Sequence, residues 1–195
     1  MRIRRTRNVV GAVLAGALMA VASPAIADAQ SSQNSGPTPV AIQDLKSASP
    51  DAKSAAAIVW YGIKNVKSGK FLQPSGGSTA NGTEIVQQSF NASTLTQLWT
   101  RIPDGSYLSL QNYSGKNLGI DGASTSAGAA AILATGSGDA NQDWIQVDRN
   151  ATDFALVNRK SGLCLGISGA STANGALAEQ FTCDGSANQG WEYYQ

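Results

Sequence analysis

Short runs of apolar residues separated by turn-forming residues dominate the chain from Val59 onward. Aromatic residues, isoleucine, leucine and valine fill these runs, and glycine, asparagine and aspartate lie between them. This pattern is typical of many short β-strands joined by tight turns. Near the C-terminus it predicts four strands, at residues 154–158, 164–167, 177–181 and 191–194. The predicted fold class is therefore all-β.

The sequence repeats itself three times, with a spacing of 45 to 47 residues between copies. The segment STANG occurs at 78–82 and at 171–175, and the related segment STSAG occupies 124–128 between them. Two other landmarks follow the same period. They are a Ser-Gly turn beginning at Ser68, Ser114 and Ser161, and a Gln-x-Trp motif ending at Trp99, Trp144 and Trp191. A unit of about 45 residues cannot bury its own apolar face, whereas three units can share one core.

The repeats define a single domain at residues 58–195, with units at about 58–105, 106–152 and 153–195. Four strands in each unit would give about twelve strands in all, joined by glycine and asparagine turns of the kind found in hairpins. A closed threefold arrangement of these strands would also remove the exposed sheet edges that invite aggregation.

The segment before this domain has a different character. Residues 1–29 combine four arginines, an apolar run of 13 residues and small residues suited to cleavage, which indicates a secretory signal peptide. The apolar run is shorter than the ~20 residues that a membrane span needs. Only Arg4-Arg5 suggests a twin-arginine signal, and the rest of that motif matches poorly. Residues 30–57, rich in Ser, Ala, Pro and Gln, predict a linker or flexible arm, and we expect a secreted, extracellular protein.

Charge and composition narrow the range of partners. Loss of residues 1–29 removes four arginines and one aspartate, so that 14 basic and 13 acidic residues become 10 and 12, a net charge of −2. This argues against nucleic acid and anionic membranes, which both require a clustered basic face. Histidine, the commonest general base and metal ligand, is absent from the sequence. We expect a monomer that holds no metal and no cofactor.

The sequence contains two cysteines, Cys164 and Cys183. In an oxidising compartment we expect them to pair. The bridge would close a loop of about 20 residues and contribute roughly 3 kcal/mol. Their spacing and number do not suit a CxxC redox centre or a zinc site.

The three Gln-x-Trp motifs, with Ser-Gly turns ahead of them, resemble the ricin B-chain type lectin family over residues 59–195. The resemblance implies a β-trefoil of three pseudo-repeats that binds galactose, xylose or related glycans. Members of this family often bridge the positions that Cys164 and Cys183 occupy here.

A tryptophan that recurs at the same point of each unit is predicted to lie in the core rather than to serve as a sugar platform, because its ring buries a large area. The glutamines of the motif are predicted mainly to tie the chain through buried amide hydrogen bonds. The predicted structural residues are Trp99, Trp144, Trp191 and Gln97. We also include Gln142 and Gln189 among the residues expected to contact sugar.

The family resemblance implies three sugar-binding positions in each unit: an aspartate after the early Cys-Leu, an aromatic residue ending the third strand, and an asparagine before the Gln-x-Trp glutamine. In the third unit these positions hold Gly166, Phe181 and Asn188. Glu179 stands near them and is a candidate for the missing carboxylate. The alternatives are core packing for Phe181, turn formation for Asn188 and an ordinary surface charge for Glu179.

The second unit retains less of this set. Gly119 and Ala134 occupy its aspartate and aromatic positions, and Asn141 remains at the third. Asp121 is a candidate substitute acceptor, although a solvated surface charge is the favoured alternative. Turn formation is the alternative for Asn141.

The first unit departs furthest from the family set. Gln73 replaces the aspartate, Gln88 stands near the aromatic position, and Thr96 replaces the asparagine. We expect this unit to be structural.

Three functions compete for this sequence. The favoured one is a secreted, non-catalytic carbohydrate-binding protein whose partner is a glycan or polysaccharide. The alternative is a secreted protein-interaction trefoil, such as a hydrolase or protease inhibitor, because one scaffold hosts unrelated functions. Catalysis is disfavoured, because nucleophilic chemistry has neither a histidine nor a free cysteine to use.

Overall fold

A computed structural model describes residues 57–195, and the structural statements below concern this part of the chain. The signal peptide expected at 1–29 lies outside the described residues, as does the arm expected at 30–57 apart from Ala57. Among the described residues, no helix is long and apolar enough to cross a membrane.

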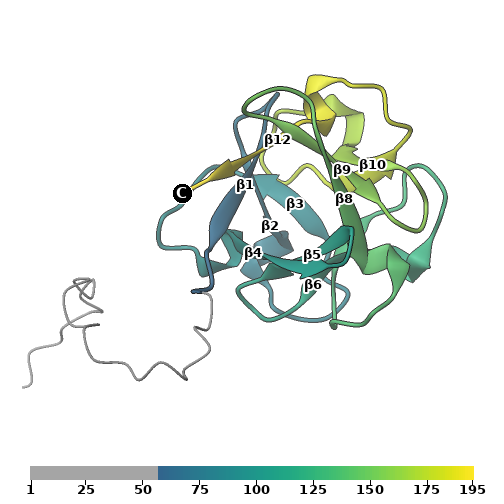
Figure 1. Cartoon of the computed structure of the whole chain (residues 1–195). Helices are drawn as coiled ribbons and strands as arrows, with labels where there is room; N and C mark the ends of the chain where they lie inside the picture. Colours follow the sequence, from purple (N-terminus) through teal and green to yellow (C-terminus); the bar gives the residue numbers. More distant parts are fainter. Residues whose placement is uncertain (1–56) are drawn as a thin grey trace, which may run out of the picture. The chain divides into compact units, whose positions relative to one another are not determined.

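Six of the twelve strands close into a barrel (Figure 1). Antiparallel pairing runs in the order β1–β4–β5–β8–β9–β12 and returns to β1. The barrel strands are β1 (Tyr61–Asn65), β4 (Leu98–Asp104), β5 (Tyr107–Asn112), β8 (Asp143–Asp148), β9 (Phe154–Asn158) and β12 (Trp191–Tyr194). The pairing of β12 with β1 joins the last unit to the first.

The other six strands form three hairpins, one in each unit. They are β2 (Phe71–Pro74) with β3 (Ile85–Gln88), β6 (Asn117–Ile120) with β7 (Ala131–Ala134), and β10 (Cys164–Ile167) with β11 (Ala178–Phe181). Isolated bridges join each hairpin to the other two. Twelve strands in three equivalent sets of four form a β-trefoil, which confirms the predicted fold class and, to within one residue, the four strands predicted in the third unit.

The repeated STANG segment forms the turn between the second and third strands of its unit, and it also connects neighbouring units. Its final glycine has a φ of about 80°, a left-handed conformation that glycine adopts without strain. The N–H of this glycine donates a hydrogen bond to the third strand of the next unit. The three bonds run from Gly82 to Leu133 O, from Gly128 to Gln180 O and from Gly175 to Gln87 O. The units are therefore linked in a ring.

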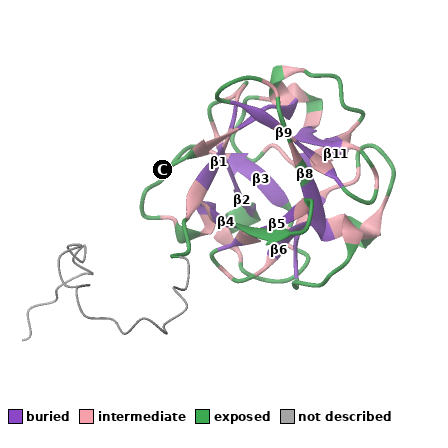
Figure 2. Cartoon of the chain, viewed as in Figure 1, coloured by how far each residue is buried: buried purple, intermediate pink, exposed green. Residues whose placement is uncertain are grey.

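The shared core lies inside the barrel and beneath the hairpins, where Figure 2 shows the buried residues gathered on the strands. Its largest side chains are the three tryptophans of the Gln-x-Trp motifs, each exposed by 1% or less. Each indole N–H donates to a backbone oxygen in the second strand of its own unit. The bonds are Trp99 to Leu72 O, Trp144 to Leu118 O and Trp191 to Leu165 O. These rings thus fasten each hairpin to the barrel.

In two of the three units, a buried glutamine of the third strand holds the STANG or STSAG turn of a neighbouring unit through hydrogen bonds. Gln180 donates from Nε2 to the backbone oxygens of Ser124 and Ser126 and accepts a hydrogen bond from the Ser161 hydroxyl. Gln87 makes the same set of contacts in the first unit, with Ser171, Ala173 and Ser68. The second unit has a leucine at this position, Leu133, and the Ser114 hydroxyl below it is buried without a partner. Within the described residues, this glutamine-to-turn contact therefore occurs in the first and third units and not in the second.

Replacing Gln180 with leucine should lower the free energy of unfolding by about 1–2 kcal/mol, because it leaves the Ser161 hydroxyl without its acceptor and removes two bonds to the turn. Leucine fits this position in the second unit, so the loss should reflect hydrogen bonding rather than packing. Urea denaturation measures the effect. Adding Ser161→Ala should recover part of the loss, and a Gln180→Leu protein as stable as the parent would contradict the prediction.

Candidate functional site

The outer face of the β10–β11 hairpin brings together the residues predicted to bind sugar in the third unit. The strands pair so that Gly166 lies opposite Glu179 and Cys164 lies opposite Phe181. Side chains alternate along a strand, so these four residues share one face while the residues between them point into the core. Gln180, buried in that core, fixes the strand that carries Glu179 and Phe181.

The Phe181 ring closes over the position where the family has an aspartate. A Cβ atom added to Gly166 would lie 3.2 Å from Phe181 Cδ2 and 3.0 Å from Gln189 Cγ. Both distances are shorter than ordinary van der Waals contacts, so a larger residue fits only if these side chains move. The glycine thus allows the half-exposed ring to lie flush against the strand. Glu179, opposite Gly166, is the predicted residue that brings a carboxylate to this face.

Asn188 turns its amide group toward the same point. Its Nδ2 would lie 3.5 Å from a Cβ on Gly166, and its Oδ1 accepts a hydrogen bond of 2.7 Å from the Ser186 hydroxyl. Ser186 also donates its backbone N–H to Asp184, and the hydrogen bonds of Ser186 hold the pKa of that carboxyl below its usual value. With Oδ1 fixed in this way, Nδ2 lies on the side of Gly166 and has no acceptor among the described residues.

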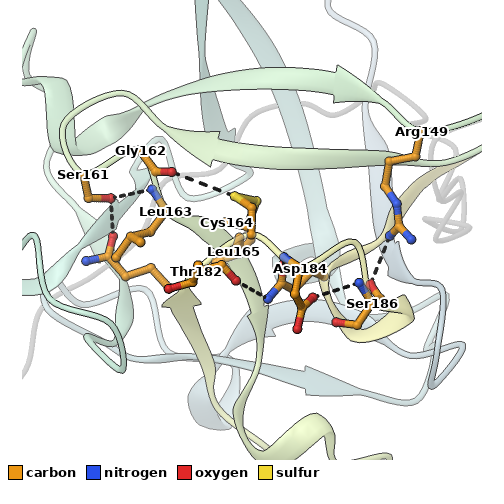
Figure 3. The surroundings of a disulfide bond; sticks show 12 residues. Arg149, Ser161, Gly162, Leu163, Cys164, Leu165, Thr182, Asp184 and Ser186 are labelled. Atoms are coloured by element: carbon orange, nitrogen blue, oxygen red, sulfur yellow. Dashed lines mark hydrogen bonds between the residues drawn. A yellow bond between two sulfur atoms is a disulfide. The ribbon is translucent and has the colours of Figure 1, made fainter.

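The disulfide and a buried glutamine hold the loop between β11 and β12 in place (Figure 3). Cys164 is bonded to Cys183, as predicted, with 5.0 Å between their Cα atoms. Gln189 donates to Thr182 O and accepts from the Asp184 N–H. The loop that carries Asn188 is thereby fixed against the hairpin that carries Phe181.

The assembled face has the chemistry of a shallow sugar site. The half-exposed phenyl ring can stack on the apolar face of a pyranose, and the Asn188 amide can donate to ring or hydroxyl oxygens. The Glu179 carboxylate, which makes no ion pair within residues 57–195, can accept hydrogen bonds from hydroxyls. The structure therefore brings three of the predicted residues together.

The second unit does not assemble the same set. Asn141 donates its Nδ2 to the backbone oxygen of Ile120, and the small, buried Ala134 offers no ring. Asp121 begins an exposed turn after β6. Its carboxylate therefore lacks the stacking partner and the free amide that accompany Glu179.

The first unit turns its equivalent residues inward. Gln73 is buried and its Oε1 accepts a hydrogen bond of 2.9 Å from Gln97 Nε2. The register Phe71↔Gln88 places Gln88 in the aromatic position, so the extra residue of this unit lies in the loop after β3. The Thr96 hydroxyl is buried without a partner. At the three family positions this unit therefore offers neither a ring nor a carboxylate to a sugar.

Gln142 and Gln189, expected among the sugar contacts, lie behind the surface and are exposed by 5% and 3%. Both ends of each amide are hydrogen-bonded within the protein, Gln142 to Thr135, Ser137 and Asn117 and Gln189 to Thr182 and Asp184. We therefore assign these glutamines to the fold rather than to the ligand surface.

A second set of repeated residues was missed in the sequence. Asn65, Asn112 and Asn158 end the first strand of each unit and are fully buried. Each donates from Nδ2 to backbone oxygens around the Gln-x-Trp motif of a neighbouring unit, which for Asn65 is that of the third unit, and accepts from the turn that follows its own strand. Their spacing of 47 and 46 residues is the signal that could have revealed them.

Within the described part of the chain, no group of three or more His, Cys, Asp or Glu side chains is arranged to hold a metal ion.

Comparison with known protein families shows to which family this chain belongs. The family model for the ricin-type beta-trefoil lectin domain matches residues 59–191. The chain belongs to the ricin-type β-trefoil lectin family. No curated protein matches the sequence.

Three solved structures place this ricin-type domain among its relatives. The designed threefold symmetric protein ThreeFoil is 35% identical with a TM-score of 0.67, over 70% of this chain and 98% of that one. The exo-β-1,3-galactanase 1,3Gal43A of Clostridium thermocellum is 31% identical with a TM-score of 0.67, over 69% of this chain and 30% of the enzyme. A ricin B-like lectin of Macrolepiota procera, solved in complex with lactose, is 23% identical with a TM-score of 0.61, over 70% of this chain and 95% of that one, and shows the fold alone.

Proposed function

We propose that this protein is a secreted, non-catalytic lectin whose principal sugar site lies on the third unit. The observation that carries the proposal is the free Nδ2 of Asn188, fixed by Ser186 beside the half-exposed ring of Phe181. Membership of the ricin-type lectin family supports carbohydrate binding in general. The geometry of the third unit supports this particular face.

Binding would use the three groups in different ways. The Phe181 ring stacks on the apolar face of the sugar, Asn188 donates to an oxygen, and Glu179 accepts from one or two hydroxyls. Because Gly166 leaves no carboxylate close to the ring, fewer hydrogen bonds fix the sugar than in a site with the family aspartate. We therefore expect weak binding by a single unit.

The expected ligands are galactose, xylose or related glycans. Galactose-containing ligands are favoured by one structural relative at 31% identity, an enzyme named as a galactanase, of which this chain covers 30%. Non-catalytic binding is supported by the absence of histidine from the sequence and by the pairing of both cysteines. Secretion is supported by the arginine-rich and apolar pattern of residues 1–29.

Replacing Asn188 with alanine should weaken galactose or lactose binding about tenfold or more, because it removes a donor aimed at the ligand. Phe181→Ala should do the same by removing the stacking surface. Titration followed by chemical-shift perturbation measures both affinity and location.

Asn141→Ala is the matched control, since the equivalent amide in the second unit already binds Ile120 O. It should leave the affinity of the third-unit site unchanged. Shifts that gather away from residues 179–188, or an Asn188→Ala protein that binds as well as the parent, would reject the assignment.

A further inference from the structure

A hollow of about 740 Å³ lies between the start of β1 and the β4–β5 hairpin. The hairpin β2–β3 adjoins the far end of β1, where Lys64 pairs with Phe71, whereas the hollow is lined by Tyr61 at its start. It is also lined by residues 57–59 and by the β4–β5 hairpin. None of the third-unit residues Glu179, Phe181 and Asn188 contributes to it.

Strand pairing explains why the hollow exists. β1 pairs with β4 only at Tyr61↔Trp99 and Gly62↔Leu98, whereas β4 continues alongside β5 as far as Asp104↔Tyr107. The chain before Tyr61 therefore separates from β4 and leaves a space beside it. Volumes of about 300–1,000 Å³ are usual for small-molecule sites.

The lining combines aromatic, amide and cationic groups. Tyr61 and Tyr107 are half-buried, as are Gln111 and Gln146. Arg101 is exposed at the same place. Tyr61, whose ring can stack on a sugar, and the positively charged Arg101 thus line the same hollow.

Arg101 has no acidic partner, in contrast to its neighbour Arg159. Arg159 lies 2.9 Å from Asp143 and 3.9 Å from Asp104, and it stacks on the Tyr107 ring. Arg101 is near only the ring of Tyr193, at 5.2 Å, and forms no salt bridge or side-chain hydrogen bond within residues 57–195. Its five N–H donors are therefore available to a ligand.

Among the described residues, no acidic side chain lines the hollow around Arg101. Threefold symmetry places Gln146 and Tyr193 at the positions equivalent to Arg101, two residues after each Trp of the Gln-x-Trp motif. The Tyr193 hydroxyl donates to Gln146 Oε1, and Gln146 Nε2 donates to Asp148, so both ends of this amide are bound within the protein. Asp148 does not line the hollow and forms no salt bridge with Arg101, so a carboxylate in the hollow can still reach the guanidinium.

We propose that the hollow is a second ligand site, independent of the third-unit site, that takes a sugar ring bearing a carboxylate. The guanidinium of Arg101 can bind a carboxylate through two parallel hydrogen bonds, which gives both affinity and orientation. The ring then lies against Tyr61, which shares the Arg101 face of the sheet because it pairs with Trp99. A neutral sugar lacks the charged contact, and a bare carboxylate lacks the ring.

The test compares D-galacturonic acid, D-galactose and acetate as probes of the full secreted chain, by titration with chemical-shift detection. Galacturonic acid should bind at least tenfold more tightly than either of the others and should shift the amides of residues 57–61 and 100–107. Arg101→Gln should weaken this binding about tenfold, and the fold accepts glutamine at the equivalent position in Gln146. Arg101→Lys should retain part of the affinity, because charge remains while the paired hydrogen bonds are lost.

Two controls separate this site from general electrostatics and from the third-unit site. Lys67→Gln removes one exposed positive charge outside the hollow and should leave galacturonic acid binding unchanged. Phe181→Ala should also leave it unchanged, while weakening galactose binding. The proposal is overturned if galactose or acetate binds the hollow as tightly as galacturonic acid, if Arg101→Gln has no effect, or if the shifts centre on residues 179–188.

Discussion

Replacing Asn65 with alanine is expected to lower the free energy of unfolding by about 3–4 kcal/mol, because one buried side chain holds several backbone groups at once. Asn65 is fully buried. Its Nδ2 donates to the backbone oxygens of Asn188 and Gly190, at 3.0 and 3.3 Å, and its Oδ1 accepts from the N–H groups of Lys67 and Ser68. Alanine would leave these groups without their partner at the junction of the first and third units. Equilibrium urea denaturation measures the change.

Asn174→Ala provides a matched control. Asn174 also links the third unit to the first, by accepting hydrogen bonds from the backbone and the hydroxyl of Ser89, but it is exposed. Its loss should cost less than about 1 kcal/mol, since water replaces the lost bonds. Equal losses for Asn65 and Asn174 would show that burial does not set the cost.

Introducing cysteines at Asn117 and Gly136 is expected to stabilise the oxidised protein by up to about 3 kcal/mol, the value for closing a loop of about 20 residues. These positions in the second unit are equivalent to Cys164 and Cys183. A Cβ on Gly136 would lie 3.5 Å from Asn117 Nδ2, so the two side chains face each other. The change also removes Asn117 Oδ1, which is buried without a partner. Urea denaturation of the oxidised and reduced forms measures the gain.

The natural disulfide between Cys164 and Cys183 provides a reference value for the stability gain expected from the new one. Replacing Cys164 and Cys183 together by serine should cost a similar amount, roughly 3 kcal/mol, by the same loop-closure argument. Peptide mapping identifies which cysteines have paired in the four-cysteine variant. If the new cysteines stay reduced under oxidising conditions, or pair and destabilise the protein, the two units differ more in backbone than their register suggests.

In the first unit, aromatic rings occupy the two positions that the disulfide joins in the third unit. Phe71 and Phe90 occupy the two cysteine positions there, with ring centroids 5.0 Å apart, and Tyr194 lies against both. The three units thus use a disulfide, an aromatic cluster and an asparagine–glycine contact at one location. Equivalent backbone geometry does not require equivalent chemistry.

Sequence spacing predicted three repeated units of four short strands, because glycine turns and core tryptophans recur wherever the backbone repeats, and the resemblance to the ricin B-chain type family added the β-trefoil arrangement. The Gln-x-Trp and STANG landmarks located the strands of the third unit to within one residue. Asn65 and its equivalents follow the same period and were missed because asparagine in a turn is commonplace. A search for any residue that recurs every 46 to 47 positions, whatever its type, would have found these three asparagines.

The candidate sugar site was predictable only in part. Position in the repeat singled out Phe181, Glu179 and Asn188, which the structure brings onto one face. Asn188 leaves its Nδ2 without an acceptor, whereas Asn141 donates its Nδ2 to Ile120 O. The orientation of each amide decides this, and Ser186 fixes it for Asn188. Arg101 was overlooked because its position holds a different residue in each unit, and a search for repeats discards such positions.

The ring of contacts between units also governs the order in which the molecule can assemble. The bond between Asn65 and Asn188 spans 123 residues, and β12 must pair with β1 before the barrel is closed. Contacts so distant in the chain require a large loss of conformational entropy before they form, which slows folding. A nascent chain that ends before residue 191 would still expose the unpaired edges of β1 and β9, so the last four-residue strand controls when the whole molecule becomes native.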